Sequence, residues 1–113
     1  MSNFGSYPEL CFGIEEEFFI LDPQTLDLVP GINTIIDSLP RCLFTGKIIY
    51  HEFHKSQIEI NSGVCFTIDD AKNDLSYLRG IINDAARDNN LRLVGIGTHP
   101  TADWRKGVIN PQY

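Results

Sequence analysis

Residues 10–21, LCFGIEEEFFIL, carry the pattern from which the fold can be worked out. The run is rich in aromatic and branched residues and stops at Asp22-Pro23, where proline removes a backbone donor that a central strand would need. It therefore predicts a β-strand. Because side chains alternate along a strand, Glu15, Glu17 and Phe19 share one face, and the other face carries Leu10, Phe12, Ile14, Phe18 and Ile20.

Further β-like segments follow this strand. We expect a short hairpin return over 26–29, strands over 47–53 and 56–61 with a turn or bulge at His54-Lys55, and a buried strand over 91–96. The connections between the first strands are too short for parallel crossovers. The sheet is therefore predicted to be largely antiparallel.

Two helices are predicted, over 32–39 and over 68–88. The first has apolar residues at helical spacing and is closed by Pro40. The second has the strongest helical periodicity in the chain, and Thr67 before Asp69 and Asp70 is typical of a capped helix start. Together these elements predict an α+β fold with helices on one face of the sheet.

Length and composition limit the domain count and the partners. The chain has 113 residues, 42% of them hydrophobic, with no internal repeat or linker. We expect residues 1–113 to form a single domain or an N-terminal fragment of a larger one. Nine basic and fifteen acidic residues give a formal charge of −6, which disfavours nucleic acid and anionic membranes as partners.

Several features favour a cytoplasmic protein. No apolar run approaches 18 residues, and the first ten residues lack a secretory signal pattern. The three cysteines have no C-x-x-C spacing, which suits a reducing compartment better than a disulfide framework or a zinc site. We therefore expect no export and no membrane insertion.

The first strand places two like charges close together. Glu15 and Glu17 are two strand residues apart, roughly 6 to 7 Å, so each raises the proton affinity of the other unless a cation lies between them. Magnesium is the natural candidate for such oxygen ligands. The alternative is that both acids point into solvent, which is the commoner case for acidic pairs. Glu16 falls on the apolar face, which requires an ion pair with Arg or Lys or a twist in the strand.

A second polar group lies along residues 56–61. Gln57, Glu59 and Asn61 share one face there. If this strand neighbours the first, Glu59 joins the other two acids, whereas Glu52 joins them only if the chain bends near His54. An ordinary amphipathic strand is the alternative.

Other kinds of site are disfavoured. Cys65 lies between apolar neighbours and is expected to be a buried thiol without a catalytic role. Gly95 and Gly97 follow a strand without opening a helix, so no dinucleotide or P-loop fingerprint exists. The histidines are too scattered in sequence to predict zinc: His51, His54 and His99.

Three motifs in order resemble the type 2 glutamate–cysteine ligase family, also called carboxylate–amine ligases. They are FGIEEEFFILDPQTLDLVP at 12–30, SQIEINSGVC at 56–65, and LRLVGIGTHP at 91–100 with Asp103-Trp104. The resemblance covers nearly the whole chain but only the N-terminal part of the family's domain. It implies a partial glutamine-synthetase-like fold, in which an antiparallel sheet forms a funnel and its acidic inner face holds Mg²⁺ ions that bridge to ATP.

The resemblance also implies roles for individual residues. The metal-binding positions are Glu15, Glu17 and Glu59, with Glu52 as a fourth candidate. The substrate-binding positions are Gln57 and Asn61 beside the metals, and Thr98 and His99 in a loop that borders the substrate region. No residue of this chain is matched to a catalytic general base.

The implied activity is an amide-forming ligase of glutathione biosynthesis, with Mg²⁺ as cofactor and ATP as co-substrate. ATP activates a carboxylate, that of glutamate, to an acyl phosphate, which an amine such as cysteine attacks. The family's basic and nucleotide-contacting region has no counterpart here, so we expect inactivity without a complementary C-terminal part. Homo-oligomerisation, or pairing with such a fragment, is the expected assembly.

Two further readings stay open. The chain could be a non-catalytic oligomerising or regulatory remnant of the fold, or an acidic metal-binding protein without nucleotide dependence.

Overall fold

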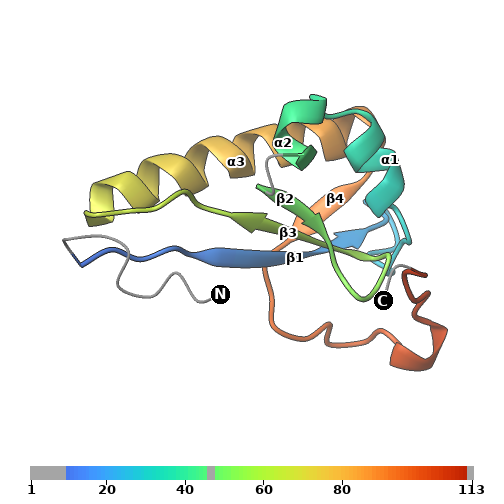
Figure 1. Ribbon diagram of the computed structural model, residues 1–113. Coiled ribbons are helices and arrows are strands. Elements are labelled where there is room, and N and C mark those ends of the chain that lie inside the picture. The colour runs from blue at the N-terminus through green and yellow to red at the C-terminus, as the bar shows by residue number, and fades with distance from the viewer. Residues whose placement is uncertain (1–9, 46–47, 112–113) are drawn as a thin grey trace.

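A four-stranded antiparallel sheet forms the centre of the computed structural model, which describes residues 10–45 and 48–111. In the order β2-β3-β1-β4, its strands are β2 (Ile49–His51), β3 (Gln57–Asn61), β1 (Glu15–Leu21) and β4 (Arg92–Val94). The helices are α1 (Ile32–Asp37), α2 (Arg41–Thr45) and α3 (Ile68–Asp88). Figure 1 shows the helices on one face of the sheet and the segment after β4 on the other. The predicted α+β class and antiparallel sheet are confirmed.

Strand β1 is shorter than the sequence predicts. It begins at Glu15 rather than at residue 10, and before it Phe12 makes only an isolated bridge to Cys65. The expected hairpin return over 26–29 is reduced to one bridge between Leu21 and Leu28. The strand over 91–96 is likewise shortened to β4, which pairs with only the last three residues of β1.

Helix α3 has the predicted bounds. The Thr67 side chain accepts a hydrogen bond from the Asp70 backbone N–H at 3.1 Å, and the Asp70 carboxylate accepts one from the Thr67 N–H at 2.8 Å. This capping box fixes the first turn. Helix α2 differs from the prediction: Pro40 ends one helical segment, and proline also suits the start of the next helix. Of the predicted strand over 47–53, Lys47 lies outside the described residues and β2 forms the central part.

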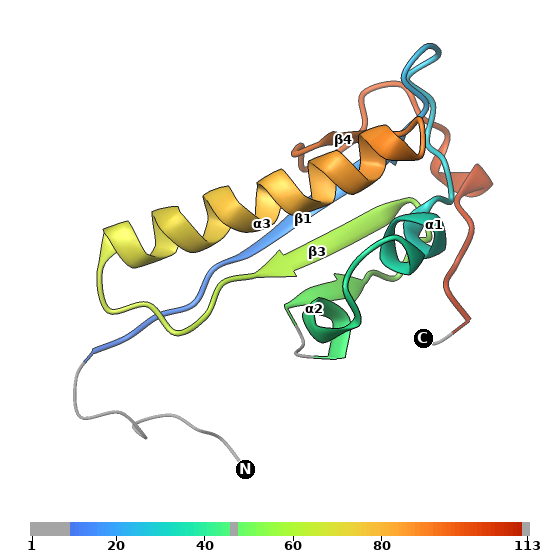
Figure 2. The ribbon, with the colours of Figure 1, turned by 90° about the horizontal axis from the view of Figure 1, so that it is seen from above.

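The core lies between the sheet and α3. Ile20 of β1 and Ile58 and Ile60 of β3 are fully buried and pack with apolar residues of α3 such as Leu78 and Ile82. Viewed from above, the axis of α3 runs nearly parallel to β1 and β3 (Figure 2). Because side chains alternate along a strand, this packing turns the odd-numbered residues of β1 and β3 away from the helices.

None of the helices formed by the described residues has both the length and the apolar character needed to cross a bilayer.

Candidate metal site on the sheet face opposite the helices

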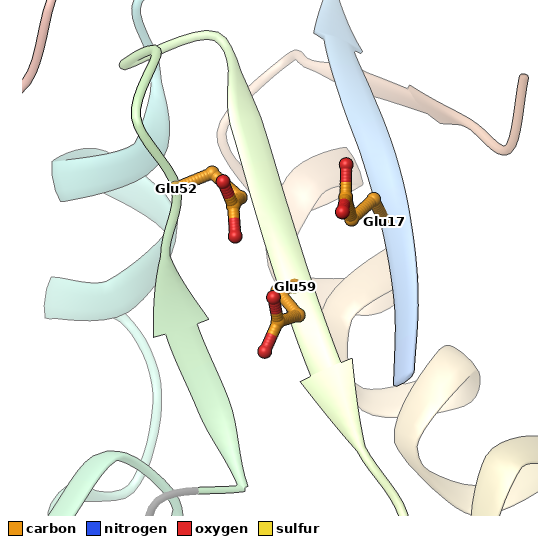
Figure 3. Close-up of side chains that lie close together, drawn as sticks. All are labelled: Glu17, Glu52 and Glu59. Carbon is orange, nitrogen blue, oxygen red and sulfur yellow. The ribbon is translucent and has the colours of Figure 1, made fainter. Parts of the chain in front are cut away.

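Three glutamates converge on the face of the sheet that α3 does not cover. Antiparallel pairing sets Glu17 of β1 directly opposite Glu59 of β3. Glu52 follows β2 in a bent segment that brings it to the same place. Carboxylate oxygens of the three residues lie within 4.8 Å of one another (Figure 3). We call these three residues the carboxylate cluster.

Glu15 lies beside the carboxylate cluster and not within it. It pairs with Asn61, and this pair lies two residues along the strands from the pair of Glu17 and Glu59. Its charge still acts on Glu59 and favours protonation there. The sequence predicted Glu15 as a metal ligand and included Glu52 only if the chain bends near His54. The structure shows this bend, and Glu52 rather than Glu15 completes the cluster with Glu17 and Glu59.

The environment of Glu59 favours its protonated form. Partial burial raises the pKa of Glu59 to about 7, and a hydrogen bond with Glu52 acts in the same direction. The Asn61 side chain donates to Glu59 and lowers its pKa, but this does not offset the other effects. In the metal-free chain the Glu59 carboxyl therefore keeps its proton to a much higher pH than an ordinary glutamate, and a bound cation would displace that proton.

The donor atoms fit a hard divalent cation. The carboxylate cluster offers only oxygen ligands, and the buried Oδ1 of Asn61 has no hydrogen-bond partner. Glu17 is exposed, so water or phosphate oxygens can complete the coordination. Within the described residues, none of the three carboxylates forms an ion pair with arginine or lysine. Carboxylate and amide oxygens are the ligands that Mg²⁺ takes in proteins.

Glu16 is held on the opposite face by Arg79 of α3. The guanidinium Nε donates to Glu16 Oε2 at 2.8 Å, and a second nitrogen of the same group contacts Oε1. The sequence offered two explanations for a charged residue on the apolar face, an ion pair or a twist in the strand. The structure shows the ion pair. It neutralises Glu16 on the helix side and leaves Glu15 and Glu17 on the other side.

Three of the four predicted substrate-binding residues line one cavity next to the carboxylate cluster. Gln57, Thr98 and His99 border a space of about 260 Å³ between the sheet and the segment after β4. Gln57 pairs with Phe19, two residues along the strands from the pair of Glu17 and Glu59. The cavity therefore begins roughly 6 to 7 Å from that pair. Asn61 lies on the other side of the carboxylate cluster, near Glu15 and Ser62.

Sequence reasoning did not single out Phe19 and Trp104, which also line this cavity. Alternation places Phe19 on the face of Glu15 and Glu17, but the strand pattern does not show that it lines a cavity. Nothing local predicts Trp104, because the long segment after β4 brings it back to the sheet.

The metal-free chain is expected to lose stability as the pH rises. The pKa of Glu59 is about 7 in the folded chain against an ordinary value of 4.5, so the folded state keeps a proton that the unfolded state releases. This contribution is complete below pH 4.5 and is lost as the pH rises through about 7. We expect a fall of about 1 to 2 kcal/mol between pH 5 and pH 8, since solvent near the site weakens the effect.

Urea denaturation at several pH values, with EDTA present, measures this dependence. The variant Glu59→Gln should flatten the curve across this range, because it removes the titrating group. A wild-type stability that rises steadily from pH 5 to pH 8 would contradict a raised pKa for Glu59 in the folded chain.

Known proteins match nearly the whole chain. A family model described as "Glutamate-cysteine ligase family 2(GCS2)" matches residues 11–113. Relatives from Solibacter usitatus, Sorangium cellulosum and Herpetosiphon aurantiacus are 41%, 37% and 36% identical over 92%, 89% and 88% of the chain. Each is named "Putative glutamate--cysteine ligase 2". The matches cover 27%, 27% and 25% of the relatives, so the chain spans about a quarter of their length.

Proposed function

Because this chain belongs to glutamate-cysteine ligase family 2, we propose that it supplies the acidic metal-binding face of an ATP-dependent carboxylate–amine ligase. The observation that carries the proposal is the convergence of Glu17, Glu52 and Glu59, whose carboxylate oxygens lie within 4.8 Å of one another. Three carboxyl groups this close on a half-buried sheet face repel one another when all are ionised, and the raised pKa of Glu59 reflects that repulsion together with burial. A function that places a cation among them accounts for their position.

The carboxylate cluster would hold Mg²⁺, with Glu15 and the Oδ1 of Asn61 next to it. When bound, the ion would neutralise phosphate oxygens of ATP and stabilise the charge that develops during phosphoryl transfer. The chain's own contribution is positional: pairing of β1 with β3 fixes Glu17 against Glu59, and the bend after β2 brings in Glu52. A chain with a formal charge of −6 repels a polyphosphate, and bound cations would overcome this repulsion.

The proposed reaction forms an amide in two steps. A substrate carboxylate attacks the γ-phosphorus of ATP, so that ADP leaves and an acyl phosphate forms. An amine then attacks the acyl carbon, phosphate leaves with the C–O bond electrons, and the amine loses a proton to the surroundings. The names of the relatives indicate glutamate as the carboxylate and cysteine as the amine. The product class is that of glutathione biosynthesis.

Activity would require more protein than these residues, because the chain spans about a quarter of its relatives. A complementary C-terminal region, or further copies of the chain, would complete the site. Large exposed apolar side chains support such association, including Leu10 at 98%, Trp104 at 80% and Ile68 at 75% exposure. All three cysteines have free thiols, which agrees with the proposed reaction taking place in the cytoplasm.

The dependence of ATP binding on a divalent cation tests the proposal. Isothermal titration of the chain, combined with the C-terminal region of a relative, should detect ATP binding in the presence of Mg²⁺ and none after EDTA is added, because the carboxylate cluster repels the triphosphate without an ion. Unchanged Mg²⁺ binding with no effect of ATP would instead indicate an acidic metal-binding protein. Binding of neither would indicate a non-catalytic oligomerising remnant of the fold.

A further inference from the structure

His99 is engaged by backbone groups at both ring nitrogens. Nδ1 accepts from the Ala102 backbone N–H at 2.9 Å and from the Thr101 N–H at 3.3 Å, while Nε2 lies 2.9 Å from the Leu26 carbonyl oxygen. Because Nδ1 accepts, it carries no proton, so the ring proton is on Nε2 and is donated to Leu26. The contacts therefore select one tautomer of the neutral imidazole.

These hydrogen bonds join two segments that are far apart in the sequence. Leu26 lies in the turn after β1, 73 positions before His99, and Ala102 lies in the segment after β4. Leu26 has a φ of 62°, a left-handed conformation that is unfavourable for a residue with a Cβ. The bond from His99 helps to hold the turn in this strained form.

The turn after β1 and the segment after β4, which His99 joins, both line the cavity of about 260 Å³. The His99 ring meets Phe19 edge-on, with 6.3 Å between ring centroids and 82° between ring planes. Phe19 and Gln57 form the sheet side of the cavity, and Thr98 and Trp104 belong to the segment that covers it. Figure 1 shows that segment passing along the face of the sheet opposite the helices.

We propose that His99 is a positioning residue, whose imidazole holds residues 97–107 over the sheet and thereby forms a pocket for the uncharged part of an amino-acid substrate. Its two ring nitrogens are committed to backbone groups, so it acts through the segment that it holds. The pocket is smaller than the roughly 300 to 1,000 Å³ typical of drug-sized ligands. Its lining combines the apolar side chains of Phe19, Leu28 and Trp104 with polar groups of His54, Ser56, Gln57 and Thr98. The identity of the ligand as a substrate rests on the proposed function.

Amide hydrogen exchange tests the positioning role without any ligand. In His99→Ala, exchange at the Ala102 amide should speed up about fivefold to tenfold, because its acceptor is lost. His99→Asn should restore protection, since its Oδ1 can take the place of Nδ1 in a local turn. His99→Gln, whose amide group lies near the place of Nε2 and leaves no acceptor at the place of Nδ1, should not. His51→Ala, the same substitution on β2, is the control and should leave exchange at the Ala102 amide unchanged.

A binding measurement separates positioning from general structural support. His99→Ala should bind Mn²⁺ within about twofold of wild type, whereas affinity for L-cysteine or L-glutamate should fall at least about tenfold and recover in His99→Asn. Equal protection of Ala102 in wild type and His99→Ala, or failure of wild type to bind either amino acid, would overturn the inference. A failure of the proposed function would be seen in a different measurement: Mn²⁺ would then bind to Glu59→Gln as tightly as to wild type.

Discussion

Replacing Glu59 with glutamine is expected to weaken binding of Mg²⁺ or Mn²⁺ to the chain by about tenfold to a hundredfold. Glu59 is the central ligand candidate, since it lies opposite Glu17 in the sheet and shares a hydrogen bond with Glu52. The amide of glutamine keeps the size of the side chain but removes the charge that attracts the cation. Isothermal titration calorimetry with Mn²⁺ measures the change directly.

Two matched variants control for the loss of one charge. Glu16→Gln removes the same charge from the same strand, but Glu16 lies on the opposite face against Arg79, so affinity should stay within about twofold. Glu15→Gln should have an intermediate effect, because Glu15 lies beside the carboxylate cluster. Equal losses in Glu59→Gln and Glu16→Gln would show that the cation responds to overall charge and not to this site.

Replacing Ile58 with alanine is expected to lower the free energy of unfolding by about 3 kcal/mol. Ile58 is the neighbour of Glu59 on β3, but its side chain points the other way and is 0% exposed within the core under α3. Truncation would remove buried methyl groups and leave a cavity that a close-packed core cannot fill. Urea denaturation followed by circular dichroism measures the loss.

The same substitution on the surface provides the control. Ile68→Ala truncates a residue that is 75% exposed, and its effect should stay within about 0.5 kcal/mol. Folded Ile58→Ala should still bind Mn²⁺ within about threefold, because the carboxylate cluster lies on the other face. An Ile58→Ala variant of wild-type stability would contradict the division of β3 into a core face and a site face.

The elements that sequence predicted best are those determined by local patterns. Helix α3 has both a periodic apolar stripe and a capping box at Thr67, so its bounds could be read directly. Strand β1 could be predicted but not its start, because pairing with β3 begins only at Glu15. The apolar residues before Glu15 have no continuous partner strand, and residue pattern alone does not show this.

The site was predicted in part for a similar reason. Alternation places Glu15, Glu17 and Glu59 on one face, but only the bend after β2 determines that Glu52 is nearer to Glu59 than Glu15 is. The conflict at Glu16 could be recognised in the sequence, yet its partner Arg79 is 63 residues away and needed the packing of α3 on the sheet. The metal-binding roles themselves stay predictions.

The cavity depends on the longest-range contacts of the chain. His99 was predicted as a substrate-binding residue from its place in a family motif, and its bonds to Leu26 and Ala102 became visible only with the fold. Residues that hold a loop and residues that touch a ligand look alike in a sequence. Hydrogen-bond partners of both ring nitrogens are what distinguish them.

Crystallography of the chain with Mn²⁺, with an anomalous difference map, tests the central claim most directly. We expect an anomalous peak at coordination distance from carboxylate oxygens of Glu17, Glu52 and Glu59, and the loss of this peak in Glu59→Gln. Carboxylates turned apart into solvent, with no peak among them at saturating Mn²⁺, would contradict it.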